Sequence, residues 1–247
     1  MNTPGAPVED PKTSHFATAR MPAPPLHRLS LKSPLGVDTP GVDVSIALRN
    51  RCVTALTQPL RINTMERNSS STKFPLGSAL PAFRLKNVDG SMLDSSTLKF
   101  DKAVLVLFSC NHCPYVKGSE AMLLELARKY SSEGLSTLTI NSNDPQQYPE
   151  DSFENMQKKS KEMKLPYPYL FDESQDVARA FDAACTPEAY LFNAQRKLVY
   201  HGALNDSHKD PSQAKKMHLA TAVEQLLSGK DPQPSFVHPI GCSIKWR

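Results

Sequence analysis

Apolar residues follow two different spacings along this chain, and each spacing predicts one kind of element. From Phe74 onward, short apolar or alternating runs are separated by longer stretches in which apolar residues recur every three or four positions. Residues 103–108 are apolar throughout and follow Asp101 and Lys102, which predicts a central strand covered on both faces. The other strands expected are 83–88 and 91–93, joined by a hairpin turn at Asp89-Gly90, followed by 135–140, 169–171, 189–192 and 197–200.

Helical spacing occupies the stretches between these strands. The helices expected in this way are 113–130, 151–164, 174–181 and 213–228. Asp151 and Glu154 form a capping-box pattern for the second of them, and we expect its Lys158, Lys159 and Lys161 on a solvated face. The element order is therefore a hairpin followed by β-α-β-α-β-α-β-β-α. This order predicts an α/β protein whose sheet is covered by helices on both faces.

Residues 1–73 show neither spacing. They contain nine of the 21 prolines, nine Lys or Arg and five Asp or Glu, so the whole net charge of +4 belongs to this segment. Such a segment buries too little apolar surface to offset the entropy of ordering it. We interpret it as a disordered, Pro-rich basic extension, which is absent if translation starts at Met65. Residues 74–230 then form the folded domain, and residues 231–247 a proline-punctuated tail that packs on it.

The sequence offers few signs of a membrane or nucleic-acid partner. No apolar run approaches the roughly 18 residues that cross a bilayer, and Glu9 and Asp10 stand where a secretory signal would be apolar. Residues 11–37 lack acidic residues, as organelle transit peptides do, but their prolines oppose an amphipathic helix. We expect a cytoplasmic protein with no membrane span, no nucleic-acid partner and no cofactor. Organelle targeting is the alternative.

Candidate chemistry lies in the cysteines, which are Cys52, Cys110, Cys113, Cys185 and Cys242. An odd number of scattered thiols without an export signal suggests a reducing compartment and catalytic rather than structural pairing. Cys110 and Cys113 lie at the junction between strand 103–108 and the following helix, and this arrangement predicts a dithiol redox centre. Cys52 has no expected role.

The junction also predicts how the two thiols differ. A thiol at the first turn of a helix faces unpaired N–H groups and the positive end of the helix dipole, which favour the reactive thiolate. We expect Cys110 to be the nucleophile and Cys113 the resolving thiol, with His112 stabilising the thiolate of Cys110. The alternatives are idle core thiols, a surface histidine without a tuning role, and a structural zinc site. Zinc takes four ligands and the chain has no second Cys-x-x-Cys, so no metal is expected.

These motifs, taken together, resemble a known family. A strand, Cys-x-x-Cys and helix, followed by Thr186-Pro187 before a hairpin ending in Gly202-Ala203, resemble the thioredoxin fold. The Asp-Gly hairpin near the start resembles the redoxin branch, which includes the AhpC/TSA and TlpA/ResA-like proteins. The segments 110–116, 184–187 and 240–246 are similar to a bacterial peroxiredoxin-like family with the motif CNHCPYV. Over residues 74–247 the resemblance implies a three-layer fold with a central mixed sheet.

The resemblance also implies how further residues are arranged. Pro187 would follow a cis peptide bond and lie against the dithiol, and the backbone of Thr186 would be free to pair with an extended substrate. Cys110 would be the more exposed thiol of the pair. Cys185 would lie near Cys110, either as a small buried apolar residue or as a third redox thiol. Cys242 could fold back from the tail as a resolving thiol.

Peroxide chemistry is less well supported by the sequence than disulfide exchange. Peroxiredoxins carry Pro-x-x-x-Thr-x-x-Cys, but Ala103 and Leu107 stand at these positions when the motif is counted back from Cys110. We therefore expect a thiol–disulfide oxidoreductase that acts on protein or small-molecule disulfides and is recycled by an external thiol reductant. A thiol-dependent peroxidase is the first alternative, with Cys113, Cys185 or Cys242 resolving. A non-catalytic redox-sensing or binding module is the second.

Overall fold

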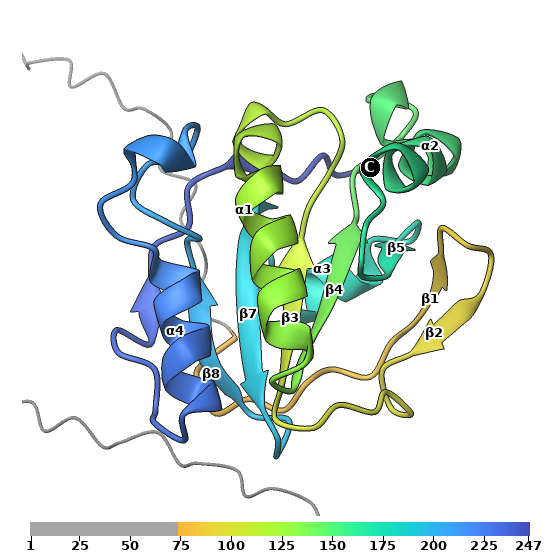
Figure 1. Ribbon diagram of the computed structural model, residues 1–247. Helices are drawn as coiled ribbons and strands as arrows, with labels where there is room; N and C mark the ends of the chain where they lie inside the picture. The colour runs from red at the N-terminus through yellow and green to blue at the C-terminus, as the bar shows by residue number, and fades with distance from the viewer. Residues whose placement is uncertain (1–73) are drawn as a thin grey trace, which may run out of the picture. The chain divides into compact units, whose positions relative to one another are not determined.

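The computed structural model describes residues 74–247, which form one domain (Figure 1). The expectations for the N-terminal extension, the second start at Met65 and Cys52 fall outside the described residues. Within residues 74–247, no helix is long and apolar enough to cross a membrane.

A mixed sheet organises the domain, with the strand order β2-β1-β5-β4-β3-β7-β8-β9. Its strands are β1 (Arg84–Asn87), β2 (Met92–Asp94), β3 (Ala103–Phe108), β4 (Leu135–Asn141), β5 (Tyr169–Phe171), β7 (Glu188–Asn193), β8 (Leu198–Gly202) and β9 (Phe236–Val237). The central strand β3 runs parallel to β4 and antiparallel to β7. A separate two-stranded sheet pairs β6 (Cys185–Thr186) with β10 (Cys242–Ser243).

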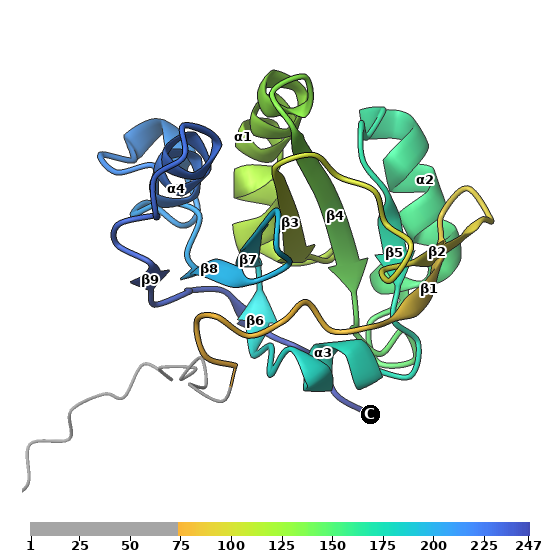
Figure 2. The same ribbon diagram turned by 90° about the horizontal axis from the view of Figure 1, so that it is seen from below.

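Helices cover both faces of the main sheet. They are α1 (Pro114–Ser131), α2 (Phe153–Met163), α3 (Asp176–Ala180) and α4 (His218–Leu227), with two 3-10 turns, η1 (Pro149–Asp151) and η2 (Pro211–Gln213). Figure 2 shows α1, α2 and α4 on one face and α3 on the other. This three-layer arrangement, together with the antiparallel hairpin of β1 and β2, confirms the fold class expected from the sequence.

The apolar run of β3 builds two cores, one on each face of the sheet. Side chains alternate across a strand, so Val104, Val106 and Phe108 contact the α3 side. Leu105 and Leu107 contact the side covered by α1 and α4. All six residues of the strand are buried, as expected for a central strand. The strand therefore ends in a fixed position, from which the chain turns into α1.

Two helix starts differ from the expectation. The N-cap of α2 is Ser152, whose hydroxyl accepts a hydrogen bond from the backbone N–H of Asn155, so the capping box based on Asp151 is wrong. Asp151 instead belongs to η1 and is fully buried, because other groups use its carboxylate. The last helix begins at His218 rather than near Gln213, which lies in the 3-10 turn η2.

The C-terminal tail contributes strands to both sheets. β9 joins the edge of the main sheet in parallel to β8, and β10 pairs antiparallel with β6. Beyond β10, Ile244 is buried in the core on the α3 side. The tail thus passes over the C-terminal end of β3, where the two cysteines of the Cys-x-x-Cys motif lie.

Candidate active site

The dithiol lies where β3 ends and α1 begins. Cys110 follows the strand by two residues, and Cys113 is the N-cap of α1, with Pro114 in the first helical position. Proline suits this position because the N–H it lacks would be unpaired there. Both cysteines are 0% exposed, which corrects the expectation that Cys110 is the more exposed. The reason is that both pack in one cluster with Val116, against which Tyr115 and Cys242 also pack.

Three other groups surround the two sulfur atoms. Thr186 places its Oγ1 at 3.3 Å from the Sγ of Cys110 and its carbonyl oxygen at 3.3 Å from the Sγ of Cys113. The peptide bond between Thr186 and Pro187 is cis, as the resemblance implies. The Sγ of Cys242 lies 2.8 Å from the Sγ of Cys113. Cys242 therefore contacts Cys113, and its thiol belongs to the site.

The backbone of Thr186 is not free. Thr186 is the strand partner of Cys242, since β6 and β10 pair antiparallel. This corrects the expectation that Thr186 offers an open edge to an extended substrate. The chain's own C-terminal strand occupies that edge.

The surroundings of the two thiols separate their pKa values. The pKa of Cys113 is lowered to about 4 by its hydrogen bond with the Cys110 thiol, by its contact with the Cys242 thiol and by the N–H of Val116, against the effect of burial. The pKa of Cys110 is raised well above its ordinary value by its hydrogen bond to Cys113, by burial and by the charge of Asp151. The geometry therefore favours the thiolate at Cys113 rather than at Cys110. The physical reason is that Cys113, not Cys110, adjoins the first turn of α1.

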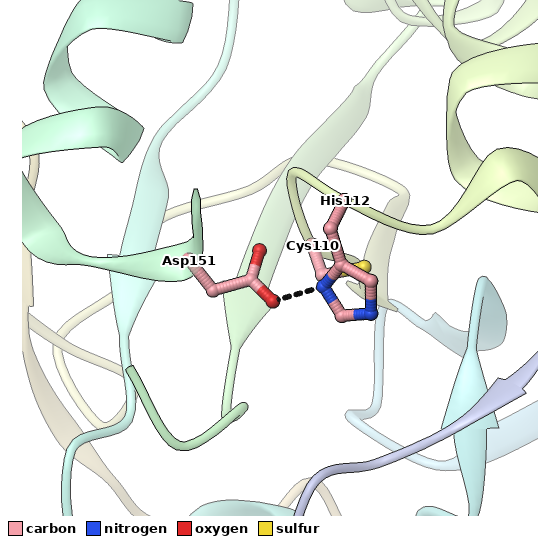
Figure 3. A group of neighbouring side chains, drawn as sticks. All are labelled: Cys110, His112 and Asp151. Carbon is pink, nitrogen blue, oxygen red and sulfur yellow. Dashed lines mark hydrogen bonds and ion pairs between the residues drawn. The ribbon is translucent and has the colours of Figure 1, made fainter. Parts of the chain in front are cut away.

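A second polar cluster adjoins Cys110 and centres on Asp151. One carboxylate oxygen of Asp151 lies 2.5 Å from Nδ1 of His112 and accepts from the side chain of Asn143 at 2.8 Å, while the other accepts from the N–H of Asn111 at 2.6 Å. Figure 3 shows Asp151 directed at the imidazole of His112, with Cys110 on the same loop as the histidine. The cluster fixes the orientation of His112 next to the dithiol.

Sequence reasoning assigned Asp151 to a helix cap and so missed this role. The signal that could have found it is topological. Asn141, at the carboxyl end of the parallel strand β4, begins a polar stretch that reaches Asp144. The carboxyl ends of parallel strands gather at one edge of a sheet, where functional side chains collect. The same edge receives the dithiol from β3.

One group of side chains in the described residues has the spacing of metal ligands. One potential ligand atom each from Cys110, His112 and Asp151 lies within 4.8 Å of the other two. These residues could supply three ligands, whereas a structural zinc site takes four. Both oxygens of Asp151 already accept the hydrogen bonds described above. These hydrogen bonds explain why the three residues lie so close together. Asp151 orients His112, and His112 lies next to the thiol of Cys110.

Cys185 lies in β6 next to Thr186 and is also fully buried. Neighbouring residues of a strand point to opposite faces, and Thr186 directs its hydroxyl at Cys110. No hydrogen bond joins Cys185 to the sulfur atoms of the site among the described residues, although the charges of Cys113 and Cys242 act on it. Burial and the charge of Glu188 raise the pKa of the Cys185 thiol well above its ordinary value, which favours the neutral thiol.

Glu188, a second residue that the sequence did not single out, supports the loop before Pro187. Its buried carboxylate accepts from the N–H groups of Ala184 at 2.8 Å and Cys185 at 3.1 Å, and it lies 2.7 Å from Nε2 of His201. Burial alone raises the pKa of Glu188, but these hydrogen bonds outweigh burial and lower it below its ordinary value. Glu188 thus fixes the backbone that brings Thr186 to the sulfur atoms.

Lys159 holds the Cys110 loop from the side of α2. Its Nζ donates to the carbonyl oxygen of Cys110 at 3.0 Å and lies 2.5 Å from a carboxylate oxygen of Glu120. Its side chain is 17% exposed, so the expected solvated face is wrong for this lysine. A small pocket lies next to this ion pair and is also lined by Ser109, Val116 and Pro187.

Comparison with known proteins defines the class of this fold and site. A model of the AhpC/TSA family matches residues 76–201, about half of the chain. The crystal structure of an uncharacterized conserved protein from Geobacillus kaustophilus is 45% identical, with a TM-score of 0.67, over 70% of this chain and 93% of that chain. A hypothetical protein from Sinorhizobium meliloti 1021 is 38% identical, with a TM-score of 0.65, over 70% of this chain and 94% of that chain. No curated protein matches.

The chain therefore belongs to the AhpC/TSA family. This membership confirms the expected redoxin branch of the thioredoxin-like fold. It also supports a redox function and an oxidoreductase in general.

Proposed function

We propose that this protein is a thiol–disulfide oxidoreductase in which Cys110 and Cys113 reduce a substrate disulfide. The observation that carries the proposal is the environment of Cys113. It is the N-cap of α1, its pKa is lowered to about 4, and a second cysteine of the same motif donates a hydrogen bond to its sulfur. A thiolate next to a second thiol is the arrangement that disulfide exchange requires.

In the first step, the thiolate of Cys113 attacks one sulfur of the substrate disulfide. A bond forms between Cys113 and that sulfur, the substrate S–S bond breaks, and the other substrate sulfur leaves as a thiolate. The assignment reverses the roles expected from the sequence, and the position of Cys113 at the N-cap of α1, next to the N–H of Val116, supports the reversal.

In the second step, the thiol of Cys110 loses its proton and attacks the sulfur of Cys113. A bond between Cys110 and Cys113 forms, and the second substrate sulfur leaves as a thiolate, so the dithiol is oxidised and the substrate disulfide is reduced. The His112–Asp151 pair next to Cys110 is the proton acceptor available for this step. An external thiol reductant then returns the enzyme to the dithiol form.

The test is the steady-state reduction of a disulfide substrate, such as insulin with dithiothreitol as reductant. We expect Cys113→Ser and Cys110→Ser each to lower the rate by at least about 100-fold, because each removes one of the two reacting sulfur atoms. Cys52→Ser is the control, since it removes a thiol to which the sequence gives no role. Full activity in Cys113→Ser would contradict the proposal. Peroxide consumption without disulfide reduction would favour the peroxidase alternative.

A further inference from the structure

Cys242 is the thiol in the site for which the exchange steps above have no use. Its sulfur lies 2.8 Å from that of Cys113, whereas a disulfide has a length of about 2.0 Å. A shift of roughly 1 Å therefore brings the two sulfur atoms to bonding distance. The two cysteines are 129 positions apart in the sequence, so the fold of the tail creates this contact.

The tail is held on both sides of Cys242. On one side, Gly241 packs so closely on Thr186 that a Cβ atom on the glycine would lie 2.2 Å from the carbonyl oxygen of Thr186. On the other side, Ile244 is buried and donates its N–H to Ala184 at 3.0 Å. Cys242 itself is paired with Thr186 in the two-stranded sheet. These contacts deliver the sulfur of Cys242 to a fixed position at Cys113.

The residue that follows Ile244 adds a polar anchor. Lys245 donates its N–H to the side chain of Asn143 at 2.9 Å. Its carbonyl oxygen accepts from the side chain of Gln175 at 2.8 Å and from the N–H of Asp144 at 2.9 Å. Asn143 also binds Asp151, so the anchor of the tail and the cluster next to Cys110 share a residue.

Exposure distinguishes Cys242 from the other thiols in the described residues. Cys110, Cys113 and Cys185 are buried, whereas Cys242 is partly exposed. An external reductant therefore reaches Cys242 before it reaches the buried pair. Burial and Cys113 raise the pKa of the Cys242 thiol to about 12, but the positive charges of Lys245 and Lys209 act in the opposite sense. The two lysines thus favour a thiolate leaving from Cys242 and suit an anionic thiol reductant such as glutathione.

We propose that Cys242 is a third reacting thiol, which exchanges with Cys113 and carries the disulfide to an external thiol reductant. The proposal rests on the proposed oxidoreductase function. The thiolate of Cys242 attacks Cys113 of the Cys110–Cys113 disulfide, which forms a Cys113–Cys242 bond and releases Cys110 as a thiolate that takes up the proton. The reductant thiolate then attacks Cys242 and releases the thiolate of Cys113. A second reductant thiol attacks the reductant sulfur bound to Cys242, which yields the oxidised reductant and the free thiol of Cys242.

The first experiment measures how fast the oxidised full-length enzyme is reduced by glutathione. The protein is oxidised with glutathione disulfide and desalted, and reduction is followed by quenching and counting free thiols. We expect Cys242→Ser to be reduced at least about tenfold more slowly than the wild type, because the remaining disulfide is buried. Ser243→Ala, a change in the same strand, is the control and is expected to match the wild type.

The second experiment traps the proposed bond in Cys110→Ser, in which Cys113 keeps only one partner. Mild oxidation is expected to produce a Cys113–Cys242 disulfide, which peptide mass mapping identifies. Equal reduction rates in wild type and Cys242→Ser, or a glutathione adduct on Cys113 without a Cys113–Cys242 bond, would overturn the inference. Failure of the proposed function looks different, because Cys242→Ser would then form no Cys110–Cys113 disulfide when substrate is added.

Discussion

At the scale of single residues, Cys113 is the thiol of the site that ionises most readily. The thiols of Cys110 and Cys242 and a backbone N–H of α1 all interact with its sulfur. Each of these interactions favours the thiolate over the neutral thiol, so together they lower the pKa of Cys113. Cys110 and Cys242 are correspondingly held as neutral thiols. The site therefore contains one thiolate and two thiols poised to attack it once it is oxidised.

This distribution predicts the pH dependence of the thiolate. Cys113 has a pKa lowered to about 4, so its thiolate is fully present at neutral pH and is lost only as the pH falls through about 4. The absorbance of the thiolate near 240 nm, followed from about pH 8 to about pH 3, is expected to be flat and then to fall. Cys113→Ser is expected to lack this transition. A midpoint near the ordinary thiol value of about 8.5 would contradict the account.

Asp151 is a positioning residue, because it acts through His112. We expect Asp151→Asn to slow the attack of Cys110 on the mixed disulfide by about 10- to 100-fold, since the histidine loses the carboxylate that orients it. The lifetime of the mixed disulfide is measured by rapid quenching and mass spectrometry, and its pH profile is expected to shift as well. Glu150→Gln, at the exposed neighbour, is the control. An unchanged lifetime and pH profile would leave Asp151 with a structural role only.

At the scale of elements, the pairing of β6 with β10 depends on hydrogen bonds that hold the backbone of β6 in place. Glu188 provides that support through the N–H groups of Ala184 and Cys185 and through its contact with His201. Its carboxylate is fully buried, so no water replaces a lost partner. Removing the charge leaves these buried donors with a weaker acceptor, which lowers the free energy of unfolding.

We therefore expect Glu188→Gln to lower the free energy of unfolding by about 3 kcal/mol, measured by urea denaturation. Glu162→Gln is the matched control, because Glu162 forms a surface ion pair with Lys158 at 4.0 Å and its side chain is 63% exposed. Loss of this ion pair is expected to lower the free energy of unfolding by less than about 0.5 kcal/mol. Equal effects of the two substitutions would show that the buried contacts of Glu188 are not a main support of this loop.

The elements also show why part of the fold is predictable from sequence. The central strand β3 and helix α1 follow from apolar spacing, because each buries a continuous surface of its own. The strands β9 and β10 have two residues each and no periodicity, and their partners lie far away in the sequence. Only the complete fold positions them. The start of α2 was missed because Asp151 fits a local capping pattern but binds groups that are distant in the sequence.

The same division applies to the site. Cys110 and Cys113 could be predicted because a local motif places them at a helix start. Their relative pKa values could not, because these depend on where α1 begins and on a sulfur contributed by the tail. Thr186 and Pro187 came from the resemblance to a family. Glu188 offered no sequence pattern, since its role depends on burial.

At the scale of the whole molecule, the domain brings segments that are far apart in the sequence to the same site. The end of β3 supplies the dithiol, the polar stretch after β4 supplies the cluster around Asp151, and the C-terminal strand β10 closes the Thr186 edge. A substrate therefore meets a site that the protein already covers with its own tail. This arrangement leaves no open edge at Thr186 for an extended substrate.

The most direct test of the oxidoreductase account is a single turnover of the fully reduced protein. Reduced full-length enzyme is mixed with an equimolar amount of glutathione disulfide and no other reductant, then quenched, and its cysteines are mapped by peptide mass. The account predicts that both halves of the glutathione disulfide are released as thiols and that the protein holds an intramolecular disulfide containing Cys113. A protein in which Cys113 stays a free thiol while glutathione disulfide is consumed would contradict it.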